Sequence, residues 1–325
     1  MQSSYMQGQA NNQSADSARE SVLRTHWRRF RRSWQLYLLL LLPLLWLFVF
    51  QYWPMYGAQI AFRNFLPGDK ISGADWVGLA NFQRFFQSAM FVRLMSNTLY
   101  LSIYSLVVGF PIPIIFALSL NQLRNGYFKQ SVQLVSYAPY FISTVVLVGM
   151  LLQFLNLRTG PINLALMALG QEPVHFMGTA SMFPSVYVWS GVWQFTGFNT
   201  VIYLAALSTI DPALHEAAVV DGANRLQRIW HIDLRGILPT AVTLLILNMG
   251  QIVNIGFEKI YLMQNPLNTS VSEVISTYVY KVGLIGGMTN YSYASAIGLF
   301  NSLIGLAMLV AANQLAKRLT GSSLW

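Results

Sequence analysis

Residues Asp211 to Pro239 read DPALHEAAVVDGANRLQRIWHIDLRGILP, and they form the one long polar passage between two strongly apolar ones. Asp211 and Pro212 predict the start of a helix, because Asp caps free backbone amides and Pro fits the first helical position. The residues that follow predict a short helix over 214–223. This passage therefore predicts a polar helical loop that connects two apolar segments.

The sequence also indicates where that short helix ends. Gly222 weakens the helix end, and Asn224 offers a turn. A second helix is expected to restart over 226–231 and to lead into the next apolar segment. A helix, a break and a second helix at a membrane surface would form a rigid projection that another protein can bind. We call this projection, residues 211–231, the knob.

The composition indicates an all-α polytopic membrane protein. Of the 325 residues, 54% are hydrophobic and 10% are charged, and the charged residues gather between long apolar runs. The net charge of +9 could suggest nucleic acid, but the basic residues flank apolar segments and form no separate domain, so membrane topology explains them better. The chain has no cysteine, which excludes disulfides and thiolate chemistry. Its 4 histidines are too scattered for a metal cluster.

The apolar runs predict six transmembrane helices and a cytoplasmic loop at 208–236. A tail at 1–33, largely disordered and basic, would precede a transmembrane domain at 34–318, and a short tail at 319–325 would follow it. The first apolar run is longer than that of a secretory signal and no cleavage site follows, so it is expected to be retained. The six spans are expected at about 34–53, 97–120, 131–154, 183–207, 237–257 and 291–313.

The basic residues predict the orientation. With six spans, both termini and the 208–236 loop share one side of the membrane, which holds 13 of the 20 Lys and Arg residues. Basic residues are enriched in cytoplasmic loops, so this side is predicted to be cytoplasmic.

Several kinds of chemistry have no motif in this sequence. It contains no G-x-x-x-x-G-K-[S/T] phosphate loop, so ATP could not be held here in the usual way. No acid, Lys or Arg lies centrally in the expected spans, which argues against a proton-coupled transporter. No H-E-x-x-H or G-x-S-x-G motif is present either. The prediction is therefore a membrane protein that is not an enzyme and holds no metal or cofactor of its own.

Neutral polar side chains beside aromatic ones suggest a substrate path. Asn248, Gln251 and Asn254 are spaced three apart, which on a helix covers an arc of roughly 120°. Amides and aromatic rings suit a sugar, which offers many hydroxyls and flat apolar faces. The alternative is that these amides only hydrogen-bond neighbouring helices. The candidate path residues are Trp189, Trp193, Asn199, Asn248, Gln251 and Asn254.

The passage around Glu216 resembles the EAA signature of permease subunits of binding-protein-dependent ABC importers. In that family, this loop is the coupling helix, which docks in a cleft of the ATP-binding subunit. The resemblance departs at Arg235, where the family usually has proline, although Pro239 follows. The alternative is an amphipathic interfacial helix without a partner. The residues that the resemblance assigns to ATPase coupling are Glu216, Ala217, Ala218, Asp221, Gly222 and Ala223.

Two further stretches carry the same resemblance. WVGLANFQRFF at 76–86 is similar to the family's approach to its second helix. The passage at 259–284 resembles the external segment of oligosaccharide permeases, with a turn at Gln264-Asn265-Pro266 and an end at Tyr278-Val279-Tyr280. Together these stretches make the chain similar to the maltose-type permeases, and in particular to their heteropolysaccharide branch. Within that branch, the chain resembles the permeases of the bacterial alginate importer.

That resemblance implies a set of partners in a bacterial inner membrane. It implies a second permease subunit, two ATP-binding subunits that carry ATP and Mg, and an external solute-binding protein. The implied substrate is an oligo- or polysaccharide, the chain itself lies among membrane lipids, and no nucleic acid is involved. Two other classes stay open: a polytopic membrane enzyme acting on glycan or lipid, and a secondary transporter.

Overall fold

The computed structural model describes residues 33–124, 126–285 and 289–320, and the chain divides into two compact units, 1–59 and 60–325. The first helical segment, Trp34–Phe62, is 29 residues long and apolar enough to cross a membrane. Its large apolar side chains are exposed from Trp34 to Tyr56, as contact with lipid requires. It consists of α2 (Trp34–Leu47), a π-helical turn (Phe48–Tyr52), α3 (Trp53–Met55) and a 3-10 stretch (Tyr56–Phe62).

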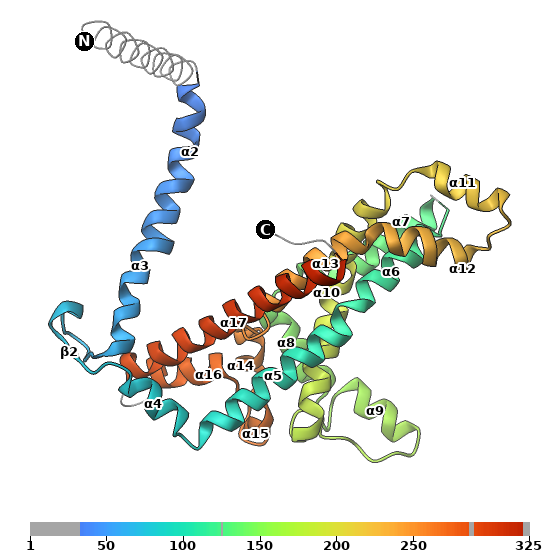
Figure 1. The fold of residues 1–325 in the computed structure, drawn as a ribbon. Helices are drawn as coiled ribbons and strands as arrows, with labels where there is room; N and C mark the ends of the chain where they lie inside the picture. Colours follow the sequence, from blue (N-terminus) through green and yellow to red (C-terminus); the bar gives the residue numbers. More distant parts are fainter. Residues whose placement is uncertain (1–32, 125, 286–288, 321–325) are drawn as a thin grey trace, which may run out of the picture. The chain divides into compact units, whose positions relative to one another are not determined.

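In the described part of the second unit, the regular structure is helical apart from one short antiparallel strand pair. Strands β1 (Arg63–Asn64) and β2 (Asp75–Trp76) pair with Arg63 opposite Trp76 (Figure 1). A 3-10 turn, Ile71–Gly73, lies between them. The α-helices are α4 (Ala80–Phe86), α5 (Met90–Gly109), α6 (Pro111–Asn121), α7 (Tyr127–Tyr137), α8 (Thr144–Phe154), α9 (Pro161–Ala168), α10 (Phe183–Leu207), α11 (Pro212–Val220), α12 (Arg225–Arg228), α13 (Leu234–Gly250), α14 (Phe257–Met263), α15 (Thr269–Ser272), α16 (Ile275–Tyr280) and α17 (Tyr291–Thr320). The shorter helical turns are the 3-10 segments Ala138–Phe141 and Ala180–Met182 and the π segments Ile229–Asp233 and Lys281–Ile285.

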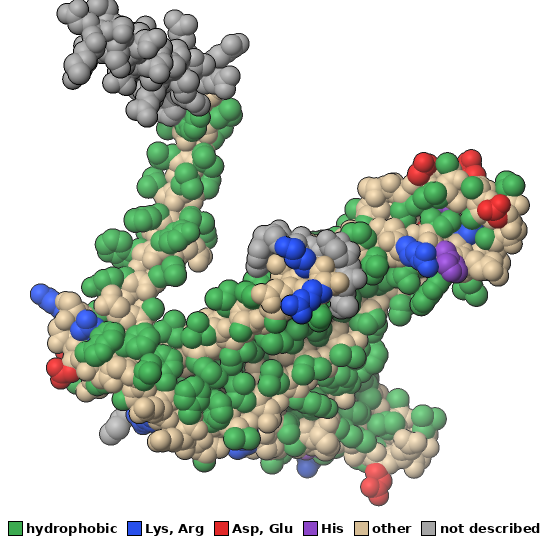
Figure 2. Space-filling model, viewed as in Figure 1, with side chains coloured by type: hydrophobic (Ala, Val, Ile, Leu, Met, Phe, Trp, Pro, Cys, Tyr) green, Lys and Arg blue, Asp and Glu red, His purple; other side chains and the backbone are tan. Residues whose placement is uncertain are grey.

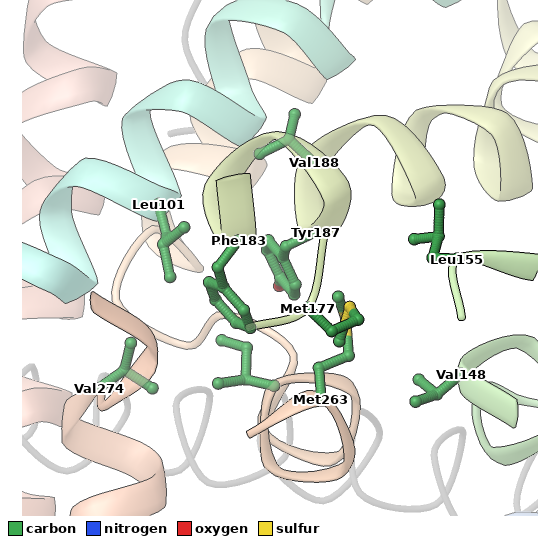
Figure 3. Close-up of a cluster of buried hydrophobic side chains, with 10 residues drawn as sticks. Leu101, Val148, Leu155, Met177, Phe183, Tyr187, Val188, Met263 and Val274 are labelled. Carbon is green, nitrogen blue, oxygen red and sulfur yellow. The ribbon is translucent and has the colours of Figure 1, made fainter. Parts of the chain in front are cut away.

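Helix α10 is central to the packing of this unit. It packs against α5, α6, α7 and α13, and α13 in turn packs against α17. Near its start, α10 contributes Phe183 and Tyr187 to a buried apolar cluster that also holds Ile260 and Met263 from α14 (Figure 3). That cluster fixes α14 against α10 and α8, which matters for the cavity described below.

Large apolar side chains also cover the outside of this unit. Figure 2 shows hydrophobic side chains over much of the visible surface, and Val107, Leu303 and Leu306 are among those exposed. A surface this apolar is typical of a protein in contact with lipid or with another membrane subunit. The chain is therefore an all-α membrane protein, as the composition predicts.

The expected single span at 131–154 is instead two helical segments. Residues 127–141 and 144–154 meet at an angle of 100°. The break has a local cause, because Ser143 has extended backbone and its Oγ accepts a hydrogen bond at 3.4 Å from the amide of Val146, which starts a new helix. The two segments together are apolar enough to be taken for one span, and mean hydropathy does not reveal the capping serine between them.

The expected span at 237–257 is also shifted. Residues Arg225–Gly250 form one continuous helical segment, so the helix starts at the predicted restart after Asn224 and ends before Gln251. In contrast, the bounds of α10 match the range expected at 183–207, although α10 is not among the described helices that are apolar enough to count as a candidate membrane span.

Within the described residues, four helical segments are long and apolar enough to cross a membrane. The number is five if residues 127–141 and 144–154 together count as one span. The count of six therefore stays a prediction. The tails at 1–32 and 321–325 lie outside the described residues, so the boundaries expected there stay predictions as well.

Candidate functional site

Helix α11 begins at the residues that the sequence indicates. The amide of Ala213 donates to the Oδ1 of Asp211 at 2.9 Å, and Pro212 is the first helical residue. Asp211 has the extended backbone typical of a helix cap. The predicted helix start is confirmed.

The end of α11 is a Schellman turn that depends on a glycine. The amide of Ala223 donates to the carbonyl of Ala218 at 2.8 Å, and the amide of Gly222 donates to that of Val219 at 3.1 Å. Gly222 has a φ of +79°, in the left-handed region where a side chain costs energy. The turn after Gly222 is therefore built from the backbone conformation that glycine allows.

A second short helix restarts at once. The amide of Gln227 donates to the Oδ1 of Asn224 at 2.9 Å, and the amide of Asn224 donates to the Oε1 of Gln227 at 2.7 Å. This reciprocal pair is a capping box, which satisfies two backbone amides of α12. Both helices of the knob are thus capped locally, so its shape depends little on the rest of the chain.

The knob presents charged and apolar groups to its surroundings. Glu216 and Ala217 are exposed, and Glu216 has no hydrogen bond or ion pair within the described residues. Val220 and Leu226 are 87% and 75% exposed. Figure 2 shows acidic side chains at this end of the second unit, where Figure 1 labels α11 and α12. A protein partner that covers this surface would bury the two apolar side chains.

A buried carboxylate fastens the knob to the helices behind it. Asp233 is fully buried, with its Oδ1 3.2 Å from the Nε2 of His215 on α11. Its Oδ2 accepts a hydrogen bond at 3.0 Å from the Nε2 of Gln122, which follows α6. A force on α11 would therefore reach both α6 and the helical segment that contains Asp233. No local sequence pattern indicates this role, because the three residues are separated in the chain.

The structure brings three of the predicted path residues together. Asn199, Asn248 and Gln251 line one cavity of about 300 Å³. Its other walls come from α5, α6 and α10, and they include the hydroxyl-bearing residues Ser105 and Tyr203. Although Gln251 follows the end of α13, it still faces the same cavity as Asn248. This grouping of amides and hydroxyls can hydrogen-bond a polyhydroxylated molecule.

Asn254 lies in a different setting from the other two amides of this stretch. Its Oδ1 accepts a hydrogen bond at 2.9 Å from the Nδ2 of Asn301 on α17, and its Nδ2 donates to the Oε1 of Gln251 at 3.5 Å. Asn301 also donates to the carbonyl of Val253 at 3.4 Å. These bonds join two segments of the protein, so they correspond to the alternative in which an amide connects helices.

The two tryptophans lie apart from the amides. Trp189 and Trp193 line a larger cavity of about 800 Å³, together with apolar residues of α8 such as Met150 and Phe154. About half of each tryptophan side chain is exposed. The structure therefore separates the predicted aromatic surface from the predicted amides, and their common role in one path stays a prediction.

One residue of interest does not appear among the predicted path residues. Lys259 on α14 is only 7% exposed and lines a cavity of about 560 Å³. That cavity shares Ser105, Gly109 and Asn199 with the amide cavity. The only sequence signal was a lysine directly after an apolar span, which is equally typical of an external loop.

Comparison with known proteins identifies the class. Residues 109–321 match the family model described as binding-protein-dependent transport system inner membrane component. The chain belongs to this family, so it is a permease of ABC importers in an inner membrane and not an enzyme.

Particular relatives match nearly the whole chain. Protein LplB of Bacillus subtilis (strain 168) is 42% identical over 89% of this chain and 90% of its own length. The polygalacturonan/rhamnogalacturonan transport system permease protein YteP of the same organism is 41% identical, covering 87% of this chain and 88% of its own. A chain from the crystal structure of a bacterial ABC transporter involved in import of the acidic polysaccharide alginate is 39% identical, with a TM-score of 0.83 over 90% of this chain and 99% of its own.

Proposed function

We propose that this chain is one of two permease subunits through which an oligo- or polysaccharide enters the cytoplasm. YteP and the alginate transporter are polysaccharide transport proteins by their descriptions, and both match this chain over most of its length. The proposed partners are a second permease, two ATP-binding subunits that hold ATP and Mg, and an external solute-binding protein. A second solved structure, of the alginate transporter with a periplasmic protein that carries an alginate pentasaccharide, supports the last of these.

The observation that carries the coupling role is the shape of the α11–α12 knob. Each helix begins with its own side-chain cap, and a glycine turn joins them. A preformed knob loses little conformational freedom when it docks, so it can transmit a movement of the ATPase to α6 and α13 through His215 and Asp233. We assign the coupling surface to Glu216, Ala217, Ala218, Asp221, Gly222 and Ala223 within the loop 208–236.

The sugar path is proposed to include the amide cavity. Asn199, Asn248 and Gln251 offer donors and acceptors to hydroxyl groups in a space walled by four helices. Trp189, Trp193 and Asn254 remain candidates at the edges of this path. In this scheme both termini face the cytoplasm, because the knob must meet the ATPase there.

The test of the coupling role is Gly222→Val in the whole importer, reconstituted in liposomes with its binding protein. A β-branched residue at φ +79° costs about 1–3 kcal/mol, so the turn should reshape and ATP-driven saccharide uptake should fall about ten-fold or more. Membrane insertion should be unchanged.

The matched control is Gly149→Val on α8, where an added Cβ meets no atom within 4 Å and the backbone is helical. This variant should transport normally. If Gly222→Val assembled and transported like the control, the coupling role would be wrong. If the wild-type complex took up no saccharide with ATP, the proposed substrate class would be wrong.

A further inference from the structure

Lys259 is a buried cation held in a fixed position. Its Nζ donates a hydrogen bond at 3.0 Å to the carbonyl oxygen of Tyr187 on α10, and lies 5.0 Å from the centre of the Tyr187 ring. The next residue on α14, Ile260, is fully buried in the cluster of Figure 3, as is Met263 one turn later. The packing of α14 therefore sets where the ammonium group lies.

No carboxylate neutralises this charge within the described residues. The ion pairs there are His215 with Asp233 and Lys281 with Glu273. Glu258 precedes Lys259 and lines the same cavity, but it is exposed and forms no ion pair with it. Burial lowers the pKa of Lys259 to about 8, so most of the group is still charged at neutral pH.

Burying a cation without a partner costs free energy, and three N–H donors need acceptors. The carbonyl of Tyr187 accepts one of the three, and no second hydrogen bond of the Lys259 ammonium occurs among the described residues. Gly191 faces the ammonium without a side chain, since a Cβ there would lie 3.4 Å from the Nζ. The ammonium group therefore keeps both free donors and space beside it.

The space beside Lys259 continues toward the amides. The cavity is lined by Gln194 and Asn199 of α10 and by Ser105 of α5, and Asn199 and Ser105 also line the cavity that holds Asn248. A charged donor thus lines a cavity that shares neutral hydrogen-bonding groups with the amide cavity. A uronic acid residue needs this combination, because it carries one carboxylate beside several hydroxyls.

We propose that Lys259 binds the carboxylate of an acidic sugar residue as it passes along this cavity, and so selects uronate-containing saccharides. The proposal rests on the proposed function, since it names the substrate class of the same path. Its chemistry is an ammonium–carboxylate hydrogen bond in a site partly shielded from water, where such a bond is stronger than at a surface.

The first test compares uptake of a galacturonate oligomer into liposomes that contain the whole importer. Lys259→Met removes the charge and keeps the length of the side chain, and it should lower uptake about ten-fold or more. Lys259→Arg should retain most of the uptake. The matched control is Lys281→Met, which also removes one positive charge but breaks the ion pair with Glu273 at 2.9 Å outside this cavity; it should transport the oligomer normally.

The amount of assembled complex is measured for every variant, and uptake is compared per assembled complex. Uptake of the galacturonate oligomer by Lys259→Met at the wild-type rate would overturn the proposal. A wild-type complex that carried only the carboxyl-reduced oligomer would overturn it too, while leaving the importer function intact. Failure of the wild type to take up either oligomer would instead contradict the proposed function.

A second measurement is needed because Lys259→Met could lose assembly and uptake together. A water-soluble carbodiimide adds to the carboxyl groups of the galacturonate oligomer, and the neutral Lys259 amine then attacks the activated carbonyl carbon, so that an amide forms and the carbodiimide leaves as its urea. Mass spectrometry of the wild-type complex should find the sugar on Lys259, and excess carboxyl-reduced oligomer should not prevent the reaction. An amide between Lys259 and a carboxylate of another subunit, or no sugar on Lys259, would contradict the proposal.

Discussion

At the residue scale, the amides of the path have two different surroundings. Gln251 lines the amide cavity with Asn248 and Asn199, whereas Asn254 is hydrogen-bonded to Asn301 on α17. An amide that serves a substrate and one that joins helices should respond differently to removal. Removing an amide that serves a substrate leaves the fold intact, whereas removing one that joins helices takes a hydrogen-bond partner from a buried group.

This difference predicts the outcomes of two leucine substitutions. Gln251→Leu should lower saccharide uptake more than it lowers assembled complex, because the substrate loses a hydrogen-bond partner. Asn254→Leu is the matched comparison, since it also replaces an amide by an apolar group and leaves the Nδ2 of Asn301 with only the 3.4 Å bond to Val253. Assembled complex and uptake are measured together for both. If Gln251→Leu lowered uptake and assembled complex in the same proportion, Gln251 would have a structural role and would not belong to the substrate path.

At the element scale, glycine brings two helices into backbone contact. A Cβ at Gly197 on α10 would overlap the backbone carbonyl of Ser136 on α7 and lie 3.0 Å from the backbone nitrogen of Tyr137. Small residues at such a crossing let membrane helices pack closely. Since α7 is one arm of the bent pair, this contact helps to hold the bend against α10.

Gly197→Ala should therefore destabilise the complex, because backbone atoms cannot move aside as a flexible side chain can. We expect a loss of about 1–3 kcal/mol, seen as a lower thermal midpoint in detergent. The control is Gly298→Ala on α17, where a Cβ meets no atom within 4 Å. Equal midpoints for the two variants would show that the crossing tolerates a methyl group.

The sequence predicted those elements whose ends are encoded locally. The start of α11 follows from Asp211 and Pro212, and the restart after Asn224 follows from a side chain that caps its own neighbours. The bend at Ser143 was missed because hydropathy alone cannot distinguish a straight span from two shorter helices. Likewise, the burial of Lys259 depends on the packing of α14 against α10 and α8, which no local pattern encodes.

At the scale of the whole molecule, coupling to a cytoplasmic ATPase requires the α11–α12 knob and the 63–76 strand pair to lie on opposite sides of the membrane. Ser208 and Ser72 are both exposed and mark these two regions. Because the chain has no cysteine, single cysteines at these positions can be read without background. Positions Ser4 and Ser322, which would report the termini, lie outside the described residues.

In spheroplasts, Ser72→Cys should react with a membrane-impermeant maleimide and Ser208→Cys should not, because the bias of basic residues predicts a cytoplasmic knob. After permeabilisation both should react. Reaction of Ser208→Cys from the outside would reverse the orientation, and it would remove the knob from contact with any cytoplasmic ATPase.

The central claim, that the α11–α12 knob docks on an ATPase subunit, is tested most directly by photo-crosslinking from Val220. This side chain is 87% exposed at the end of α11, so a benzophenone amino acid there should not disturb the fold. Leu169, which is 77% exposed at the end of α9, is the matched control position. In membranes that contain the whole importer, we expect an adduct with a Walker-motif ATPase from Val220 and none from Leu169. No ATPase adduct from Val220, or equal adducts from both positions, would contradict it.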